Sequence, residues 1–153
     1  MKNILKKIGL LLLVVLVIMQ FIRPDKNESG YESVAYFENE TKPTPEIKEI
    51  LRNNCYDCHS NQTVYPWYAE IAPVSHWLAH HVDEGKEHFN VSDWEQYSVK
   101  KKDHKLEELI EEVEEGEMPL SSYTWIHGDL EKEEMEMLIN WTNELRKKYT
   151  TPQ

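Results

Sequence analysis

The first segment of the chain is an apolar run whose pattern differs from that of every later segment. Three lysines among the first seven residues precede this run over residues 8–22, which only Gly9 and Gln20 interrupt. A basic start followed by such a run is typical of a secretory signal or a signal anchor. No small-x-small cleavage site follows the run directly, so the sequence predicts that residues 1–22 remain as a membrane-anchor helix. The lysines predict a cytoplasmic N-terminus.

The pattern changes over residues 23–43. This segment is polar, carries charges of both signs and contains Gly30 and Pro43. Such a composition is typical of a linker. Residues 23–43 are therefore expected to connect the N-terminal helix to a single domain over residues 44–150, a length that suits one modest domain.

Apolar residues recur at helical spacing along residues 44–150. A first helix is predicted from Thr44 to Cys55, because Thr-Pro is a favourable pair for the N-cap and first helical position. Four further helices are expected. The first covers residues 75–85, and a short one begins at Ser92. The third ends at Gly116, and the last begins at Asp129. Residues 117–128 are expected to form a loop. No strand-like alternation of useful length occurs, so the sequence predicts an all-α domain.

The net charge of the chain limits the classes of partner that it is expected to bind. The chain contains 17 Lys and Arg against 28 Asp and Glu, and its formal net charge is −11. Because residues 1–22 contain three lysines and no acidic residue, residues 23–153 carry a net charge of −14. Such a surface repels nucleic acid, and it favours a protein partner with a basic docking face.

The candidate chemistry centres on residues 55–59, Cys-Tyr-Asp-Cys-His, which match the C-x-x-C-H pattern of c-type haem attachment. In this pattern the two thiols add to the two vinyl groups of one porphyrin. The histidine directly after the second cysteine then reaches the iron from the proximal side. Cys55 and Cys58 are the only cysteines of the chain. The pattern predicts one covalent haem c, attached at Cys55 and Cys58 with His59 as the proximal axial ligand.

Three other interpretations of the two cysteines are less consistent with the sequence. A thioredoxin-like redox pair usually lies in a βαβ context, which the sequence lacks. A structural disulfide across two intervening residues would be strained and would close little chain. A zinc site would need two histidines in addition, and six histidines follow the motif: His76, His80, His81, His88, His104 and His127. None of these forms a finger-type pair at the usual distance from the cysteines.

The predicted loop over residues 117–128 offers a sixth ligand. Met118 stands in a Glu-Met-Pro sequence between two predicted helices, where a loop can fold over the distal face of a haem. A thioether is a soft ligand that suits reduced iron and raises its potential. Met118 is therefore the expected distal axial ligand. His81 and His127 are the alternatives, and an open distal position is a third.

Aromatic residues are plentiful after the motif, as a haem pocket in a small domain requires. We expect Trp67 and Tyr123 to contribute to the pocket, together with His81 and His127. An ordinary role in the hydrophobic core would account for many of the other aromatic residues.

The chain also resembles a known family, the bacterial haem-binding domain family of small membrane-anchored c-type cytochromes. The resemblance covers about residues 40–148, and its most specific stretches are residues 54–94 and 114–141. They include the NCYDCH motif, the Pro-Trp-Tyr run, the Met-Pro pair and the following Tyr123 and His127. The resemblance implies the same covalent attachment at Cys55 and Cys58, with His59 as the proximal and Met118 as the distal ligand. His76 departs from the pattern, because another aromatic residue is expected there.

The element order is also similar to that of class I cytochromes c, which implies a cytochrome c-like helical domain around one haem. The expected function is single-electron transfer between redox proteins of the cell envelope, without enzymatic activity. The expected location is the bacterial inner membrane, as a single-pass protein with the haem domain on the outer side. The alternative function is a haem-based sensor or a peroxide-reactive protein with an open distal site.

Overall fold

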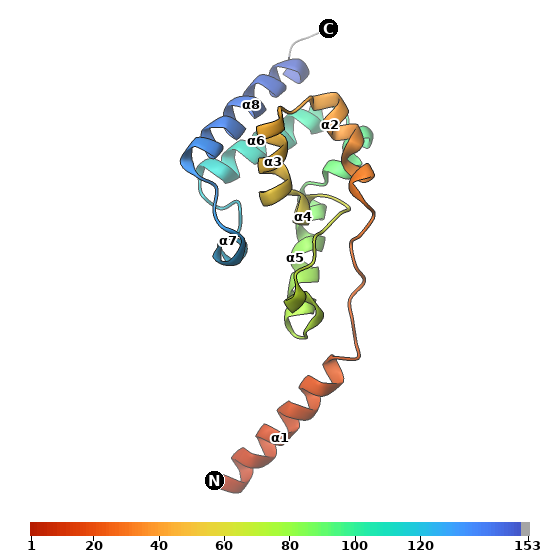
Figure 1. Cartoon of the computed structure of the whole chain (residues 1–153), viewed down its shortest axis with the longest axis vertical. Helices are drawn as coiled ribbons and strands as arrows, with labels where there is room; N and C mark the ends of the chain where they lie inside the picture. Colours follow the sequence, from red (N-terminus) through yellow and green to blue (C-terminus); the bar gives the residue numbers. More distant parts are fainter. Residues whose placement is uncertain (151–153) are drawn as a thin grey trace.

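Apolar residues at helical spacing form a series of helices in residues 1–150, the part of the chain that the computed structural model describes. No strand occurs among these residues, and one isolated bridge pairs Glu28 with Gln62. The prediction of an all-α fold is therefore confirmed. The elements are α1 (Lys2–Met19), η1 (Tyr31–Val34), α2 (Ala35–Thr41), α3 (Pro45–Asn54), α4 (Tyr56–His59), η2 (Trp67–Glu70), α5 (Val74–His88), η3 (Val91–Gln96), α6 (Val99–Glu114), α7 (Ser121–His127) and α8 (Lys132–Thr150) (Figure 1).

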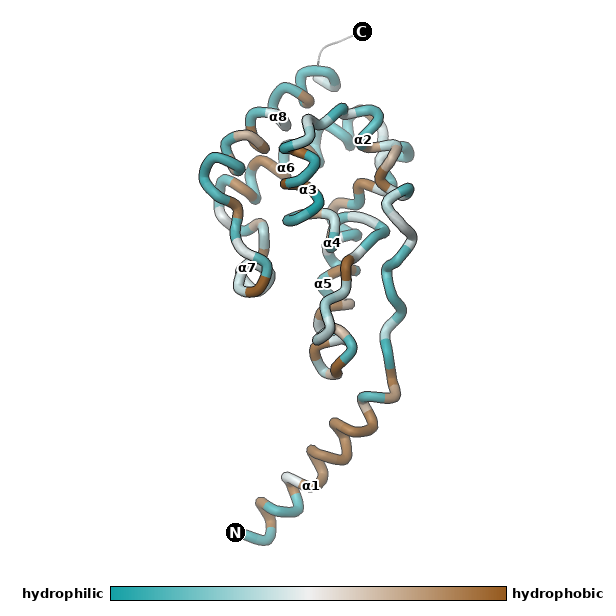
Figure 2. The backbone as a smooth tube through the Cα atoms, in the orientation of Figure 1, coloured by the Kyte–Doolittle hydropathy of each residue, from teal (hydrophilic) through white to brown (hydrophobic). Residues whose placement is uncertain are grey.

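Helix α1 projects from the rest of the molecule and buries no side chain, and Figure 2 shows that hydrophobic residues make up most of its length. Three lysines occupy its first turns, so its apolar part, residues 8–19, extends only ~18 Å at ~1.5 Å per residue. The hydrocarbon core of a bilayer is ~30 Å thick. Within residues 1–150, no helix is both long and apolar enough to cross a membrane. The predicted membrane-anchor helix over residues 1–22, and the predicted single-pass location in a bacterial inner membrane, are therefore wrong.

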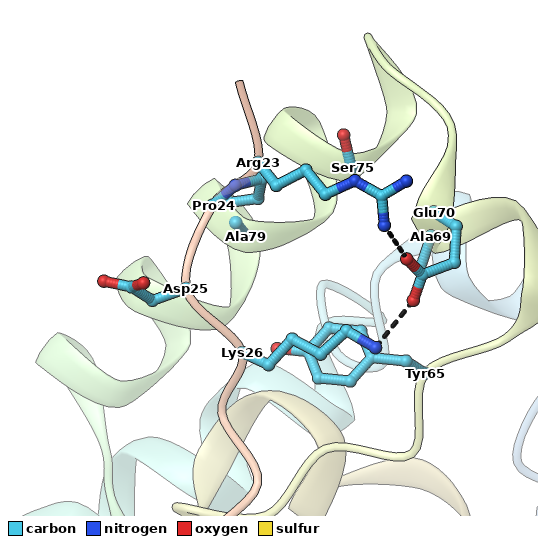
Figure 3. A pocket seen from close by; sticks show the side chains of 9 residues that line it. All are labelled: Arg23, Pro24, Asp25, Lys26, Tyr65, Ala69, Glu70, Ser75 and Ala79. Carbon is cyan, nitrogen blue, oxygen red and sulfur yellow. Dashed lines mark hydrogen bonds and ion pairs between the residues drawn. The ribbon is translucent and has the colours of Figure 1, made fainter. Parts of the chain in front are cut away.

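The extended segment after α1 lies along the helical domain and is fastened to it. The side chain of Gln20 donates to the carbonyl of Ala72 and accepts from its amide, both at 3.0 Å. Arg23 and Lys26 both reach the carboxylate of Glu70, at 2.7 and 2.6 Å (Figure 3). Polar side chains at regular intervals thus hold this segment against the loop before α5.

Residues 31–41 differ from the polar linker expected over residues 23–43, because they form η1 and α2 and pack into the core. Val34 and Phe37 are fully buried. The ring of Phe37 meets Trp94 edge to face at 5.1 Å and Trp141 at 6.3 Å. Two apolar residues three apart thus anchor this short amphipathic segment in the core, although charged residues surround them in the sequence.

The main core lies between α3, α6 and α8. Helix α3 begins as predicted, with the Thr44 hydroxyl accepting from the amide of Ile47 and proline at the first helical position. Fully buried residues of all three helices meet in this core: Ile50 and Leu51 from α3, Leu106 and Val113 from α6, and Leu138 and Leu145 from α8. Helix α3 is thereby fixed with its C-terminal end, and the C-x-x-C-H motif that follows, at the edge of the core.

The partly buried carboxylate of Glu40 joins α2 to the core helices. Lys102 donates to both oxygens of Glu40 at 2.8 Å, and Tyr149 and Trp94 donate to the same carboxylate. Burial alone would raise the pKa of Glu40, but the hydrogen bonds from Lys102 and Tyr149 lower that pKa below its ordinary value. The pair therefore fastens α2 to α6 and α8 in its ionised form.

Candidate functional site

A cavity of about 410 Å³ lies beside the C-x-x-C-H motif. Its volume falls in the range of ~300–1,000 Å³ that is usual for ligand and cofactor pockets. Residues from α3 to α6, the loop after α6, the start of α7 and α8 form its wall. Much of this wall is apolar, and its apolar members include Leu51, Phe89, Val91, Leu109, Val113, Leu120, Leu130 and Leu138.

The single turn of α4 brings the three residues of the motif to this wall. Cys55 ends α3, and its carbonyl accepts from the amides of Cys58 at 3.2 Å and His59 at 2.9 Å. Residues three and four apart share one face of a helical turn, so Cys55, Cys58 and His59 all line the cavity. Tyr56 points the other way and is buried in the core.

Both cysteines are free thiols, and each is partly buried in the wall of the cavity. Burial raises the pKa of Cys55 to about 12, with a smaller contribution from Cys58. Burial, and then the charge of Asp57, raises the pKa of Cys58 to about 11. Redox-active C-x-x-C pairs instead carry a cysteine whose pKa is lowered to about 3.5–7.5. The thiols of this site are therefore protonated at neutral pH, which disfavours the thioredoxin-like interpretation.

The ring of His59 is oriented by the end of α5. Its Nδ1 atom lies 2.9 Å from the carbonyl oxygen of Phe89. A carbonyl only accepts, so Nδ1 carries the proton and Nε2 keeps its lone pair. Burial lowers the pKa of His59 against the opposing effect of the hydrogen bonds to Phe89 and Gly85. A neutral imidazole with an oriented, free Nε2 is the form that binds a metal.

Helix α5 makes its closest approach to the motif at Gly85. A Cβ atom at this position would lie 2.6 Å from the carbonyl oxygen of Cys58 and 3.0 Å from its Cβ atom. Only glycine fits there. Helix α5 runs past Gly85 to His88, three residues beyond the end expected from the sequence. This extension carries Phe89 to the position from which its carbonyl reaches His59.

The Met118 loop closes another side of the cavity. Gly116, with a φ of 73°, ends α6, and the carbonyl of Glu112 then accepts from the amides of Glu117 at 2.9 Å and Met118 at 3.0 Å. Met118 is partly buried, packs against the core and lines the same cavity as Cys55, Cys58 and His59.

The other candidate residues divide into two groups. His81 and Tyr123 line the cavity, and the ring of His81 meets Trp77 edge to face at 4.5 Å. Trp67 and His127 lie outside it. Trp67 is 78% exposed, and His127 stacks on Tyr123, with their ring centroids 4.2 Å apart. The structure thus brings six of the eight sequence-predicted residues to one cavity.

Sequence reasoning missed several residues of this site. Phe89 acts through its backbone, so its side chain gave no signal. Gly85 offered one, because an isolated glycine within a helical pattern often marks a close approach. At the rim, His88 from α5 and Lys105 from α6 also line the cavity, and Lys105 pairs with Glu108 at 2.5 Å. The zinc interpretation would need a cluster of at least three His, Cys, Asp or Glu side chains around one point, and residues 1–150 contain no such cluster.

Comparison with known proteins adds one finding to this geometry. A family model described as a haem-binding domain matches residues 14–144. The match includes every residue that lines the cavity. No curated protein and no solved structure matches the chain significantly.

Proposed function

The chain belongs to the haem-binding domain family, and from this premise we propose that it is a mono-haem c-type cytochrome that transfers single electrons. Cys55 and Cys58 attach the haem covalently, His59 binds the iron on the proximal side, and Met118 binds it on the distal side. One observation carries the proposal: two thiols, an imidazole with a free Nε2 and a thioether line one largely apolar cavity.

The residues present fit a haem of this type. The macrocycle is large and apolar, and the cavity wall is rich in aliphatic side chains with Phe89 among them. The attachment needs two thiols three residues apart on one face, and the α4 turn supplies them. Each thiol would add across one vinyl group, with its sulfur bonded to one carbon and its proton to the other, so that no electron is gained or lost. Protonated thiols, which the raised pKa values of Cys55 and Cys58 indicate, carry the proton that this addition uses.

The protein groups around the iron position determine the kind of chemistry. A haem bound here would supply a one-electron couple at its iron. The bond from His59 to the Phe89 carbonyl fixes the ring orientation of the proximal ligand and keeps Nε2 unprotonated. Met118 would close the distal side with a soft ligand and exclude other ligands. If His59 and Met118 both held the iron, no open site would remain for a substrate, so we expect electron transfer without enzymatic activity.

A haem-based sensor or peroxide-reactive protein is the second candidate function. It is favoured by the position of His81, which lines the cavity and could serve as a distal hydrogen-bond donor if Met118 did not bind. Carbon monoxide separates the two functions. The reduced protein should bind it slowly if Met118 is the ligand and rapidly if the distal side is open.

The charge of the molecule supports a particular class of partner. The carboxyl-terminal part of α6 and the residues after it are rich in glutamate, and Glu108 and Glu112 reach the rim of the cavity. We expect the partner to be a redox protein that docks through a basic face, with association weakened by salt. Nucleic acid is not expected to bind.

Visible absorption spectra test the proposed function. The full chain is produced together with c-type haem maturation, as wild type, Met118→Ala and Met137→Ala. Met137 is a matched control because it lies on α8, 42% exposed and outside the cavity. Wild type and Met137→Ala should show sharp reduced bands of a low-spin c-type haem and the weak far-red band of methionine-bound oxidised iron. Met118→Ala should lose the far-red band and have a lower midpoint potential. A high-spin spectrum of the wild type, or a far-red band that persists in Met118→Ala, would contradict the assignment.

A further inference from the structure

Helix α7 is the part of the cavity wall that hydrophobic packing does not explain. It buries no side chain, and Figure 1 shows it apart from the helices that form the core. Trp125 and Ile126 on its surface are 91% and 63% exposed. A short helix without buried apolar residues gains little stability from burial. Specific polar contacts must therefore hold it in place.

The first of these contacts comes from Tyr123. Its hydroxyl lies 2.7 Å from the carbonyl oxygen of Asn53 and 3.1 Å from Oδ2 of Asp57. Asn53 is in the last turn of α3, and Asp57 stands between the two cysteines in α4. Asp57 is itself fixed, since its Oδ1 accepts from the amide of Val64 at 2.8 Å. The Tyr123 hydroxyl thus joins α7 to the segment that carries the haem-attachment motif.

The second contact is made by His127, which holds the Tyr123 ring on its outer face. The ring of His127 stacks on the ring of Tyr123, with centroids 4.2 Å apart and an angle of 7° between planes. Nε2 of His127 is hydrogen-bonded to the hydroxyl of Tyr68 at 3.0 Å. Tyr68 belongs to η2, so α7 is tied to two separate segments. The tie to α3 and α4 is made by the Tyr123 hydroxyl, and the tie to η2 is made by His127, whose ring stacks on Tyr123.

Met118 lies between this connection and a second fixed point. On its amino-terminal side, the amides of Glu117 and Met118 are bonded to the carbonyl of Glu112 on α6. On its carboxyl-terminal side, α7 begins at once, with the Leu120 carbonyl accepting from the amide of Tyr123 at 2.8 Å. The distance from the Met118 backbone to the attachment motif is therefore set by α6 at one end and by Tyr123 at the other.

We propose that Tyr123 is a positioning residue that clamps the Met118 loop to the attachment segment and so keeps the methionine on the iron. This inference rests on the proposed function. Without the hydroxyl, α7 would keep its stacked ring pair and the bond from His127 to Tyr68, but it would lose its tie to the attachment segment at Asn53 and Asp57. The loop would then open more often, and the Met118 thioether would leave the iron more often. His127 and Tyr68 act in support, since they hold the Tyr123 ring from its outer face.

The test measures how fast carbon monoxide binds to the reduced full-length protein with its haem attached. Carbon monoxide competes with the distal ligand, so its binding rate reports how often Met118 is displaced. The variants are Tyr123→Phe, which keeps the ring and removes only the hydroxyl, and Met118→Ala, which defines the fully open rate. Tyr65→Phe is the matched control. It also loses one bonded tyrosine hydroxyl, but Tyr65 contacts Asn27 and lies outside the cavity.

The clamp predicts a rate for Tyr123→Phe about tenfold above wild type, which corresponds to ~1.4 kcal/mol, with unchanged covalent haem content and an unchanged rate for Tyr65→Phe. Equal, slow rates for wild type and Tyr123→Phe, beside a fast rate for Met118→Ala, would overturn the clamp while the proposed function stands. A wild-type rate equal to that of Met118→Ala would overturn both, because Met118 would not be a ligand.

A second measurement does not depend on haem coordination. Amide hydrogen exchange over residues 117–128 is compared between wild type and Tyr123→Phe. The comparison is repeated in haem-free versions of both proteins, in which Cys55→Ser and Cys58→Ser remove the attachment sites. Exchange in this segment should be several-fold faster without the hydroxyl, while exchange in α6 and α8 stays the same. Unchanged exchange over residues 117–128 would overturn the clamp, even if Tyr123→Phe failed to acquire haem.

Discussion

At Gly85, α5 lies so close to the backbone of Cys58 that a Cβ atom would come within 2.6 Å of its carbonyl oxygen. This contact has two consequences for the site. It places the α4 turn, with both thiols and His59, directly against α5. It also sets the register of α5 so that the carbonyl of Phe89 reaches Nδ1 of His59 at 2.9 Å. The position of Cys58 and the orientation of the His59 ring therefore depend on the absence of a side chain at Gly85.

Gly85→Ala should destabilise the protein, although alanine is the better helix former by ~1 kcal/mol. The new methyl group would meet backbone atoms that cannot move without shifting α4, and such overpacking costs ~1–3 kcal/mol. Chemical denaturation measures the change. Gly9→Ala is the matched control, because nothing lies within 4 Å of a Cβ atom at Gly9 in α1. Equal stability of Gly85→Ala and wild type would show that α5 is not held as closely as the structure has it.

Glu40→Gln should cost ~1–3 kcal/mol, because it leaves the ammonium group of Lys102 without its anion. The side chain of Lys102 is only 9% exposed, so water cannot replace the carboxylate fully. Adding Lys102→Met to Glu40→Gln should restore part of the loss, since an apolar chain can occupy this position without a partner. Glu136→Gln removes an exposed ion pair on α8 and should change stability little. A Glu40→Gln protein as stable as the Glu136→Gln control would rule out a stabilising role for the pair.

The same carboxylate predicts a pH dependence. The pKa of Glu40 in the folded protein lies below its ordinary value of 4.5. Its contribution to stability is therefore fully present above about pH 4.5 and is lost as pH falls through the lower folded pKa. The difference in unfolding free energy between wild type and Glu40→Gln should narrow as pH falls below about 4.5. A difference that stays constant or widens on acidification would contradict the lowered pKa.

Phe37→Ala should destabilise the protein by ~3–5 kcal/mol, the usual cost of removing a fully buried aromatic ring. The expectation follows from its edge-to-face packing against Trp94 and Trp141. Asn39→Ala, at an exposed position of the same helix, should change stability by less than ~0.5 kcal/mol. If both variants unfolded at the wild-type denaturant concentration, residues 31–41 would be the linker that their composition suggests.

The sequence predicts those parts of the molecule in which local pattern decides structure. Thr44 and Pro45 begin α3 as expected, and the apolar stripes of α6 and α8 form the core, because cap chemistry and helical spacing act within a few residues. The prediction of a membrane anchor for α1 is wrong. A basic start and an apolar run resemble a membrane anchor, but the lysines fall within the helix and shorten its apolar part.

The rest of the site depends on contacts between segments far apart in the chain. The packing of Phe37 against Trp94 and Trp141 cannot be recognised from the neighbouring residues in the sequence. The sequence therefore predicts a linker over residues 31–41. The Phe89 carbonyl is a backbone group, and every residue has one. Tyr123 and His127 were expected beside a haem, but their contacts with Asp57 and Tyr68 follow only from how α7, α4 and η2 are placed.

Intact-mass measurement under denaturing conditions tests the central claim most directly. The chain is produced with c-type haem maturation, as wild type and with Cys55→Ser and Cys58→Ser combined. We predict that the wild-type chain retains the added mass of one haem after unfolding, and that the double variant has the mass of the polypeptide alone. A wild-type chain that loses its haem on unfolding, or never acquires one, would contradict covalent attachment at Cys55 and Cys58.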